Sequence, residues 1–471
     1  MPISTKTQYD IIILGAGIAG LNAAYEILKR SPNSRLLVIE KEKILGGRVH
    51  TYTDKYMSVE AGAGRLHSGQ KHAVTLIGEL GLSDHLIPIG SGDFGFFDVG
   101  REGREGEMNS APNRDIVLKL IQASHHENVS ELRAMSLLDF ASKVLEDHEI
   151  KCLCDSFGYY TELVLMNAHD SLSLISGHLS ADHKYMVLRG GLSQVIENLA
   201  KRVLDMGGEI KTNCCCLDID GDDTGSGYIL SCKHGGGRTD IFENLRGGGV
   251  TRKKSRHANH TRRRHVRIGV YYAKKVICAL PKQVLETFAF FRPVWPDLHH
   301  IVCEPLCRIY SKFPLDDDGR AWFHDLSKFT TNNNLRIVIP IDSSNGVIMS
   351  SYTDYKFARF WKKLYGKKSG GGGGSRARDI RAVNKELVRL LGESTGIESI
   401  PTPIKTIMFY WPCGVGYWGV GADSHEISRK LVRPFSDKDI FICGEHFSEK
   451  NQQWIEGALE TSHHISDLVC M

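Results

Sequence analysis

Residues 10–20 read DIIILGAGIAG, and this stretch decides the fold class. Asp10–Leu14 is a short, continuous apolar run, which is typical of a strand buried on both faces of a parallel sheet. The turn Gly15–Gly20 follows with the spacing GxGxxG, and Leu21–Arg30 continues as an expected helix. A glycine-rich turn between a strand and a helix predicts an α/β fold of the Rossmann type that binds a dinucleotide.

Each glycine of this turn has a separate structural reason. Gly15 permits the tight turn, Gly17 lets a pyrophosphate approach the backbone, and Gly20 lets the helix pack closely on the strand. Arg35–Ile39 is a second expected strand, and Glu40 follows it. A carboxylate at this place accepts hydrogen bonds from ribose hydroxyls and repels a 2′-phosphate, which favours FAD or NAD over NADP. An unrelated glycine-rich turn is the weaker alternative.

A second anion cradle is expected shortly after Glu40. Gly46 and Gly47 leave backbone N–H groups accessible, and Arg48 adds a fixed cation. Plain NAD dehydrogenases do not need such a cradle. The alternative, a surface arginine, is disfavoured by the short spacing from the strand–turn–helix unit.

The bulk composition limits the class of protein. A chain of 471 residues is too long for one ordinary core, so we expect two domains. The net charge of +4 is too small to require nucleic acid or anionic lipid as a partner. The polar N-terminus and the lack of an apolar run of about 18 residues predict no secretory signal and no membrane anchor, hence a soluble cytoplasmic protein.

The 12 cysteines are scattered without a repeated pair spacing. In a chain with an ordinary core, this pattern favours free thiols in a reducing cytosol over a disulfide framework. Cys152 and Cys154 have no second pair at zinc spacing, so we expect no metal site.

Four stretches carry a resemblance to the flavin monoamine oxidase family, the FAD-dependent amine, polyamine and L-amino-acid oxidases. Residues 11–51 (IIILGAGIAGLNAAYEIL to LLVIEKEKILGGRVHT) are similar to the opening of these enzymes. Val59–Leu66 (VEAGAGRL), Tyr410–Gly419 (YWPCGVGYWG) and Phe441–Glu460 (FICGEHFSEKNQQWIEGALE) resemble three flavin-lining motifs, in the same order.

The resemblance implies a Rossmann-type FAD-binding domain and a mixed α+β substrate domain. The FAD-binding domain is expected to be discontinuous, from residues 8–85, 186–285 and 402–471, with the substrate domain at 86–185 and 286–401. Within residues 86–185 we expect helical stretches such as Ser136–Glu149. Residues 235–267 read as a Gly-rich and then basic insert, and residues 369–375 (SGGGGGS) as a flexible linker. The basic insert could bind nucleic acid, but a solvated surface extension is the commoner outcome.

The resemblance also implies which residues hold the cofactor. A helix beginning near Trp454 would stabilise the flavin with its N-terminus, and Leu217 would offer its backbone to the adenine. The residues expected to contact FAD are Gly15, Gly17, Ile18, Ala19, Gly20, Glu40, Lys41, Gly46, Gly47, Arg48, Gly62, Ala63, Gly64, Arg65, Leu217, Trp411, Tyr417, Gly444, Glu445, Trp454, Ile455 and Ala458.

Four residues are expected to act on the substrate. Tyr417 and Trp454 match the family's aromatic cage, although both could be core aromatics. Arg308 stands where many relatives have a lysine that holds a water at flavin N5, and arginine cannot act as a base. A different alignment would give this role to Lys312. Arg65 matches an arginine that grips a substrate carboxylate, or it pairs with Glu60.

Gly416 stands where monoamine oxidases have the cysteine that bonds FAD covalently, so we expect noncovalent FAD. The leading hypothesis is FAD-dependent oxidation of a C–N bond of an amine, with O2 as the final acceptor. The alternatives are an L-amino-acid oxidase, an FAD desaturase or isomerase of an apolar substrate, and a low-turnover flavoprotein that binds nucleic acid or chromatin through its basic insert.

Overall fold

The computed structural model describes residues 8–90, 95–99, 109–110, 113–179, 183–221, 227–235, 267–366 and 380–470. The predicted basic insert lies outside the described residues except for its two end positions, and the predicted linker lies wholly outside them.

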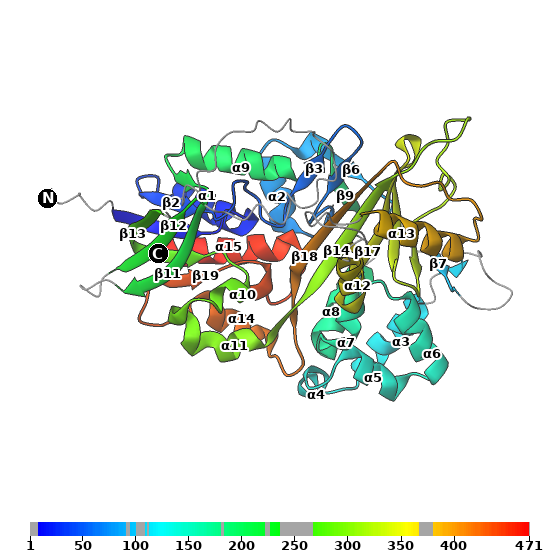
Figure 1. Cartoon of the computed structure of the whole chain (residues 1–471). Coiled ribbons are helices and arrows are strands. Elements are labelled where there is room, and N and C mark those ends of the chain that lie inside the picture. Colours follow the sequence, from blue (N-terminus) through cyan, green and yellow to red (C-terminus); the bar gives the residue numbers. More distant parts are fainter. Residues whose placement is uncertain are drawn as a thin grey trace, which may run out of the picture.

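The N-terminal strand is central to a seven-stranded sheet (Figure 1). Its side chains Ile11 and Ile13 pack on one face of the sheet, while Ile12 and Leu14 pack on the other, which is why this strand is apolar throughout. The strands, in sheet order, are β10 (Glu209–Lys211), β2 (Leu36–Ile39), β1 (Gln8–Leu14), β13 (Arg267–Cys278), β12 (Tyr228–His234) and β11 (Cys214–Gly221), and β19 (Ile440–Ile442) also pairs with β13. Strands β10, β2, β1, β13 and β19 pair in parallel.

Helices cover both faces of this sheet. One face carries α1 (Ile18–Arg30), α2 (Lys71–Glu79), α9 (Ser193–Asp205) and α15 (Ile455–Cys470). The other carries α10 (Lys282–Leu285), η4 (Ala289–Val294), α11 (Trp295–His299) and α14 (Ser424–Val432). This layered arrangement confirms the predicted α/β fold with its strand, turn and helix at residues 8–30.

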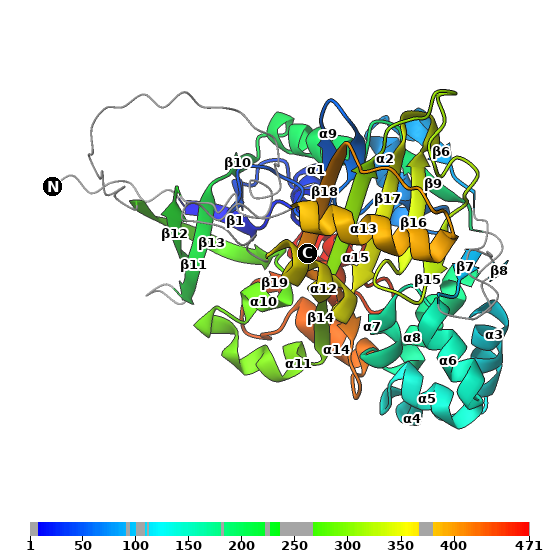
Figure 2. The same cartoon turned by 45° about the vertical axis from the view of Figure 1, so that its right-hand side comes forward.

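A second seven-stranded sheet is mostly antiparallel. Figure 2 shows α12 (Tyr355–Tyr365) and α13 (Ile380–Thr395) lying across it. Its strands, in order, are β18 (Lys405–Trp418), β14 (Ile301–Lys312), β17 (Val347–Asp354), β16 (Ile337–Asp342), β15 (Phe329–Thr331), β7 (Gly95–Phe97) and β8 (Asn109–Ser110). The turn η5 (Ser343–Asn345) joins β16 to β17. The mixed α+β part of the predicted fold is therefore also present.

A group of short helices packs around its own apolar cluster. It comprises α3 (Asn113–Ser124), α4 (Val129–Arg133), α5 (Leu137–Val144), α6 (Asp147–Ser156), α7 (Tyr160–Val164) and α8 (Ala168–Leu179). The helical stretch expected at Ser136–Glu149 is helical but divides into two helices. The chain becomes extended at Leu145, and Glu146 and Glu149 then form a capping box that starts α6.

Two small sheets complete the fold. The first contains β5 (Leu66–His67), β9 (Tyr185–Leu188) and β6 (Leu86–Pro88), which η1 (Ser83–His85) precedes. The second pairs β3 (Thr51–Thr53) with β4 (Ser58–Glu60). Strand β18 lies in a segment assigned above to the FAD-binding domain but pairs with β14 of the second sheet. The domain boundaries remain a prediction.

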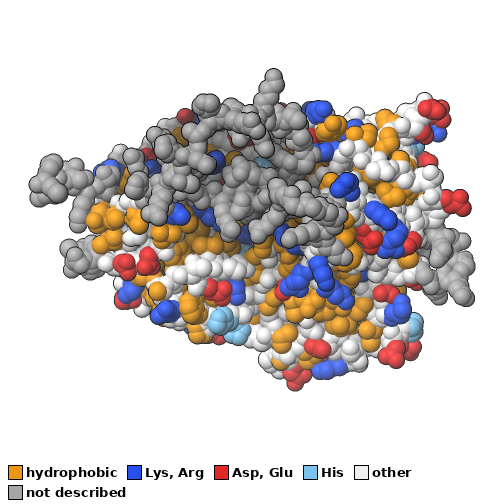
Figure 3. Space-filling model, viewed as in Figure 1, with side chains coloured by type: hydrophobic (Ala, Val, Ile, Leu, Met, Phe, Trp, Pro, Cys, Tyr) orange, Lys and Arg blue, Asp and Glu red, His pale blue; other side chains and the backbone are white. Residues whose placement is uncertain are grey.

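The described surface carries charges of both signs. On the face in Figure 3, basic and acidic side chains are interspersed among hydrophobic ones. Among the described residues, no helix combines the length and the apolar character needed to cross a membrane.

Candidate functional site

The glycine-rich turn has the geometry of a phosphate cradle. Gly15 has a φ of 99°, and a Cβ on Gly20 would collide with the main-chain oxygen of Gly15. A Cβ on Gly17, by contrast, would have as its nearest neighbour the oxygen of Gly46, 3.9 Å away. Side chains are therefore excluded where α1 meets β1, while open space remains at the helix N-terminus.

The second glycine pair lies directly against the first turn. The N–H of Gly46 donates to the oxygen of Ala16 at 2.9 Å, and Gly17 and Gly46 form a bridge. Both Gly46 and Gly47 have positive φ, at 105° and 58°, which favours glycine. The structure thus brings the two predicted cradles together, and they fit a pyrophosphate.

Glu40 is buried at the end of β2 and also shapes this turn. One carboxylate oxygen accepts the N–H of Ala16 at 2.9 Å, and the other accepts that of Glu42 at 2.8 Å. Each oxygen keeps a second lone pair for a ribose hydroxyl. Lys41, beside it, is exposed and forms a 3.9 Å ion pair with Glu42.

The predicted adenine contact lies in β11. A β-bulge separates Cys216 from Asp218, so Leu217 has no partner residue in β12, and its side chain is 48% exposed. The N–H of Cys214, in the same strand, donates to the oxygen of Glu40. The backbone of Leu217 is therefore available to a ligand.

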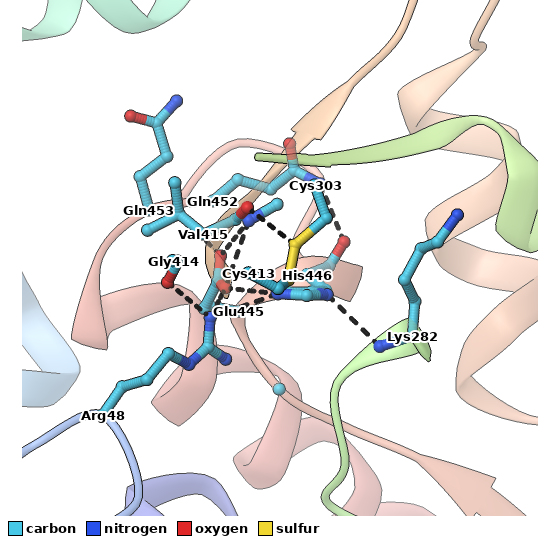
Figure 4. A network of polar contacts seen from close by, with 12 residues as sticks. Arg48, Lys282, Cys303, Cys413, Gly414, Val415, Glu445, His446, Gln452 and Gln453 are labelled. Atoms are coloured by element: carbon cyan, nitrogen blue, oxygen red, sulfur yellow. Dashed lines mark hydrogen bonds and ion pairs between the residues drawn. A yellow bond between two sulfur atoms is a disulfide. The ribbon is translucent and has the colours of Figure 1, made fainter. Parts of the chain in front are cut away.

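Arg48 joins the cradle to the C-terminal motif (Figure 4). Its Nη1 donates to the oxygen of Gly414 at 3.0 Å and forms an ion pair with Glu445. The second carboxylate oxygen of Glu445 accepts the N–H of Gln453 at 2.9 Å, and both oxygens lie near the N–H of Gly416. Burial alone would raise the pKa of Glu445, but His446 and Arg48 lower it to about 2. The Glu445 carboxylate is therefore a fixed anion.

His446 is a buried residue of this network that the sequence analysis missed. Its Nδ1 accepts the N–H of Lys282 at 3.3 Å, so its Nε2 carries the proton and donates to Glu445 at 3.0 Å. Burial lowers the pKa of His446, and the neighbouring Glu445 opposes this shift. Its place directly after Glu445 in a flavin-lining motif is the signal that could have identified it.

Cys303 and Cys413 form a disulfide in the same network. The expectation of free thiols is therefore wrong for this pair, although the other cysteines are free. Strand β14 lies beside β18, and a register shift between Glu304 and Leu306 accompanies the approach of the two cysteines. Sequence spacing could not indicate this pairing, because the residues are 110 positions apart.

The two sulfur atoms and His446 Nε2 lie within 4.8 Å of one another, a spacing compatible with a metal ion. Metal binding at Nε2 would move the imidazole proton to Nδ1, which already accepts the N–H of Lys282. The hydrogen bonds therefore disfavour a metal here.

The expected Gly-Ala-Gly segment is held from two sides. Trp411 Nε1 donates to the oxygen of Ala61 at 2.7 Å, and the guanidinium of the half-buried Arg308 donates to the oxygen of Gly62. A Cβ on Gly62 would collide with the oxygen of Arg48, and the N–H of Ala63 donates to that same oxygen at 3.0 Å. This packing places the segment beside Arg48. Lys312, the alternative to Arg308, instead contacts Asn345 on the surface.

Tyr417 and Trp454 belong to one small apolar cluster with Met166 and Leu174. Tyr417 is 1% exposed, whereas Trp454 is only partly buried and directly precedes α15. Ile455 and Ala458, in the first turns of that helix, are buried against α1. Gly444, with a φ of 133°, lies before η6 (Glu445–Phe447). The two predicted cage residues therefore belong to one apolar cluster, and Trp454 lies directly before α15.

Arg65 lies beside this cluster. Its guanidinium carbon is 5.8 Å from the ring centre of Trp454 and 5.2 Å from that of Tyr185, and its Nη2 donates to the Tyr159 hydroxyl at 3.3 Å. Among the described side chains, Arg65 forms no ion pair with Glu60, which accepts hydrogen bonds from Thr51 and the backbone of Leu192 instead. The charge of Arg65 thus faces aromatic rings and a hydroxyl.

Sequence reasoning also missed the residues that α7 brings to this region. Tyr159 is half-buried and Glu162 is buried, and the carboxylate of Asp354 accepts the N–H groups of Tyr160 and Thr161 at the start of α7. Burial raises the pKa of Glu162 well above its ordinary range, and Asp354 raises it further. Burial also raises the pKa of Tyr417 well above its ordinary value, and Asp354 and Glu162 raise it further, so these carboxyl groups lie near the Tyr417 hydroxyl. No local sequence motif marks these residues.

Comparison with known proteins identifies the family to which the chain is similar. A family model described as flavin containing amine oxidoreductase matches residues 18–470. The chain is 40% identical over 86 residues to the flavin-dependent L-tryptophan oxidase RebO of Lentzea aerocolonigenes, which is 17% of this chain and 18% of that protein. It is 37% identical over 91 residues to the coproporphyrinogen III oxidase of Propionibacterium freudenreichii subsp. freudenreichii, 19% of this chain and 17% of that protein.

These sequence matches span less than a fifth of each relative. The fold is similar over a much longer range. A solved structure of a redesigned putrescine oxidase superposes with a TM-score of 0.70 and 15% identity, covering 98% of this chain and 99% of that one.

Proposed function

The chain belongs to the family of flavin-containing amine oxidoreductases, and we propose that it binds FAD noncovalently and oxidises a C–N bond of an amine. The observation that most supports the amine is the presence of Tyr417 and Trp454 in one apolar cluster beside the N-terminus of α15. Two flat apolar walls at this place would orient a neutral amine and exclude water.

The cradle residues would hold the cofactor. The backbone around Gly15–Gly20 and Gly46 would bind the pyrophosphate, with Arg48 as its counter-ion, and Glu40 would accept hydrogen bonds from the ribose. Noncovalent binding is supported by the absence of a thiol at Gly416 and by the engagement of Cys413 in a disulfide.

When bound, FAD supplies the oxidising chemistry: it accepts a hydride from the carbon next to nitrogen and passes the electrons to O2, giving an imine and H2O2. The protein would position that carbon with Tyr417 and Trp454. The nearly complete burial of Tyr417 would keep the imine away from bulk water until release, and it favours a neutral amine because a desolvated ammonium is costly.

An L-amino acid is the second candidate substrate, because Arg65 lies over the ring of Trp454. A guanidinium there would bind a substrate carboxylate through paired hydrogen bonds. It would also disfavour a substrate that carries only an ammonium group.

The test is anaerobic mixing of the purified yellow protein with separate panels of amines, L-amino acids and reduced porphyrins, while flavin absorbance is followed. Bleaching by amines or amino acids, but not by the porphyrins, is expected. Bleaching by the reduced porphyrins alone would contradict C–N oxidation and favour the desaturase alternative. The nucleic-acid alternative is tested by titrating the same protein with labelled RNA and DNA, and we expect no tight binding.

A further inference from the structure

The Cys303–Cys413 disulfide differs from the other cysteines in its surroundings. Cys278, Cys307 and Cys443 are fully buried thiols whose pKa burial raises, and such thiols react slowly. The two disulfide cysteines are only partly buried, so a small reductant can reach them.

The disulfide is also coupled to the proposed pyrophosphate cation. Cys413 directly precedes Gly414, whose oxygen accepts the Arg48 guanidinium at 3.0 Å. On the other side, Cys413 Sγ lies 3.7 Å from His446 Nε2, which donates to the carboxylate that pairs with Arg48 (Figure 4). The disulfide therefore fixes the segment of β18 on which the orientation of Arg48 depends.

We propose that Cys303–Cys413 is a site of reversible thiol–disulfide exchange, and that its reduction by an external dithiol weakens the binding of FAD. This inference rests on the proposed binding of FAD near Arg48. With the disulfide intact, the Gly414 oxygen holds Arg48 in place. Without the disulfide, the part of β18 around Cys413 and Gly414 becomes more mobile. Arg48 is then held less firmly in the orientation that would bind the pyrophosphate.

The exchange balances with a dithiol as the co-reactant. A thiolate of the dithiol attacks Cys303 Sγ, the bond to Cys413 breaks, and Cys413 leaves as a thiolate beside the N–H of His446. The second thiol of the reagent then displaces Cys303. The protein gains two protons and two electrons, and the reagent becomes a cyclic disulfide.

The experiment uses the full-length chain and dithiothreitol as the dithiol. The FAD dissociation constant is measured by flavin fluorescence for oxidised protein and for protein reduced and then freed of reagent without air. Mass spectrometry of the peptides that contain Cys303 and Cys413 reports the disulfide. We expect reduction to raise the dissociation constant about threefold or more, as loss of preorganisation implies, and reoxidation to restore it.

Two variants make the result specific. The double variant Cys303→Ala/Cys413→Ala should bind FAD as weakly as the reduced parent and should not respond to dithiothreitol. Cys307→Ala, on the same strand but buried in a separate core, should respond like the parent. An equal dissociation constant in both redox states, or peptides with free thiols throughout, would overturn the inference. A protein that binds no FAD in either state would instead contradict the proposed function.

Discussion

The guanidinium of Arg308, in β14, donates to the main-chain oxygen of Gly62, which lies in the loop between β4 and β5. Arg308 is half-buried, its guanidinium carbon lies 4.5 Å from the ring centre of Tyr352, and it also donates to the oxygen of Glu60 at 3.3 Å. Arginine stays protonated at all working pH values, so it holds the segment at residues 60–65 rather than removing a proton.

We therefore expect Arg308→Met to lower stability. Loss of the donor leaves the oxygen of Gly62 without this partner, at about 1–3 kcal/mol for an unsatisfied group, whereas the oxygen of Glu60 still accepts from the Tyr310 hydroxyl at 2.8 Å. Arg308→Lys keeps one charged donor and should recover part of the loss. The melting temperatures of both variants and their FAD content check this expectation. An Arg308→Met variant as stable as the parent would show that the segment is held by other contacts.

Glu40 is expected to act on FAD both directly and through the turn. Glu40→Gln keeps one acceptor oxygen and loses one charge-assisted bond, worth about 1.5–3 kcal/mol, so FAD affinity should fall roughly tenfold or more. Glu40→Arg removes both acceptors for Ala16 and Glu42 and should also lower the melting temperature of the apoprotein. Fluorescence titration and thermal melts separate the two effects. Unchanged FAD affinity in both variants would mean that the ribose is held elsewhere.

The proposal that FAD is bound noncovalently can be tested directly. Acid precipitation of the yellow protein should leave the flavin in the supernatant, because Gly416 has no thiol and a Cβ there would already press against His446. Absorbance of pellet and supernatant measures this. Flavin that stays in the pellet after washing would refute noncovalent binding.

The predictable part of the fold is the part that local sequence determines. The strand, turn and helix at residues 8–30 follow from an apolar run and a glycine spacing, and their close approach to Gly46 follows from two neighbouring turns that exclude side chains. The helix break at Leu145 was missed because the capping residues Glu146 and Glu149 also suit a helix interior.

The unpredictable part of the site depends on tertiary packing. Tyr159 and Glu162 reach the region of Arg65 and Tyr417 through the docking of α7 on Asp354, and nothing near them in sequence signals it. The disulfide depends on the register of β14 against β18. Both contacts join segments more than 100 positions apart, beyond the reach of any local pattern.

The buried carboxyl of Glu162 predicts a pH dependence of stability. Its pKa is raised in the folded state, so above the ordinary value of 4.5 the unfolded chain binds fewer protons than the folded one, and stability falls as pH rises. Glu162→Gln removes this dependence, with a difference of at most about 1.4 kcal/mol per pH unit. Denaturant unfolding is measured from acidic to alkaline pH. The free energy of unfolding of the variant should rise relative to that of the parent as pH rises. Glu131→Gln, at an exposed position of α4, is the control and should show no such gain.

Tyr417 and Trp454 are expected to form the substrate face, and graded substitutions test this without emptying the core. Removing a fully buried aromatic ring to Ala costs about 3–5 kcal/mol, so Tyr417→Leu and Trp454→Leu are better choices than Ala. Each opens one wall of the slot, and a misplacement of the substrate carbon by about 1 Å can slow the reaction on the order of a hundredfold.

Tyr417→Phe keeps the wall and should stay near the parent rate. The matched control is Trp418→Phe, because the neighbouring side chain of β18 points to the opposite face, into a different core cluster. Anaerobic stopped-flow reduction of the bound flavin is the measurement, with FAD content checked for every variant. Slow reduction in both Leu variants, with parent-like rates in Tyr417→Phe and Trp418→Phe, is the expected pattern. Parent-like rates in both Leu variants would remove the pair from the active site, and the desaturase alternative would then account better for the cluster.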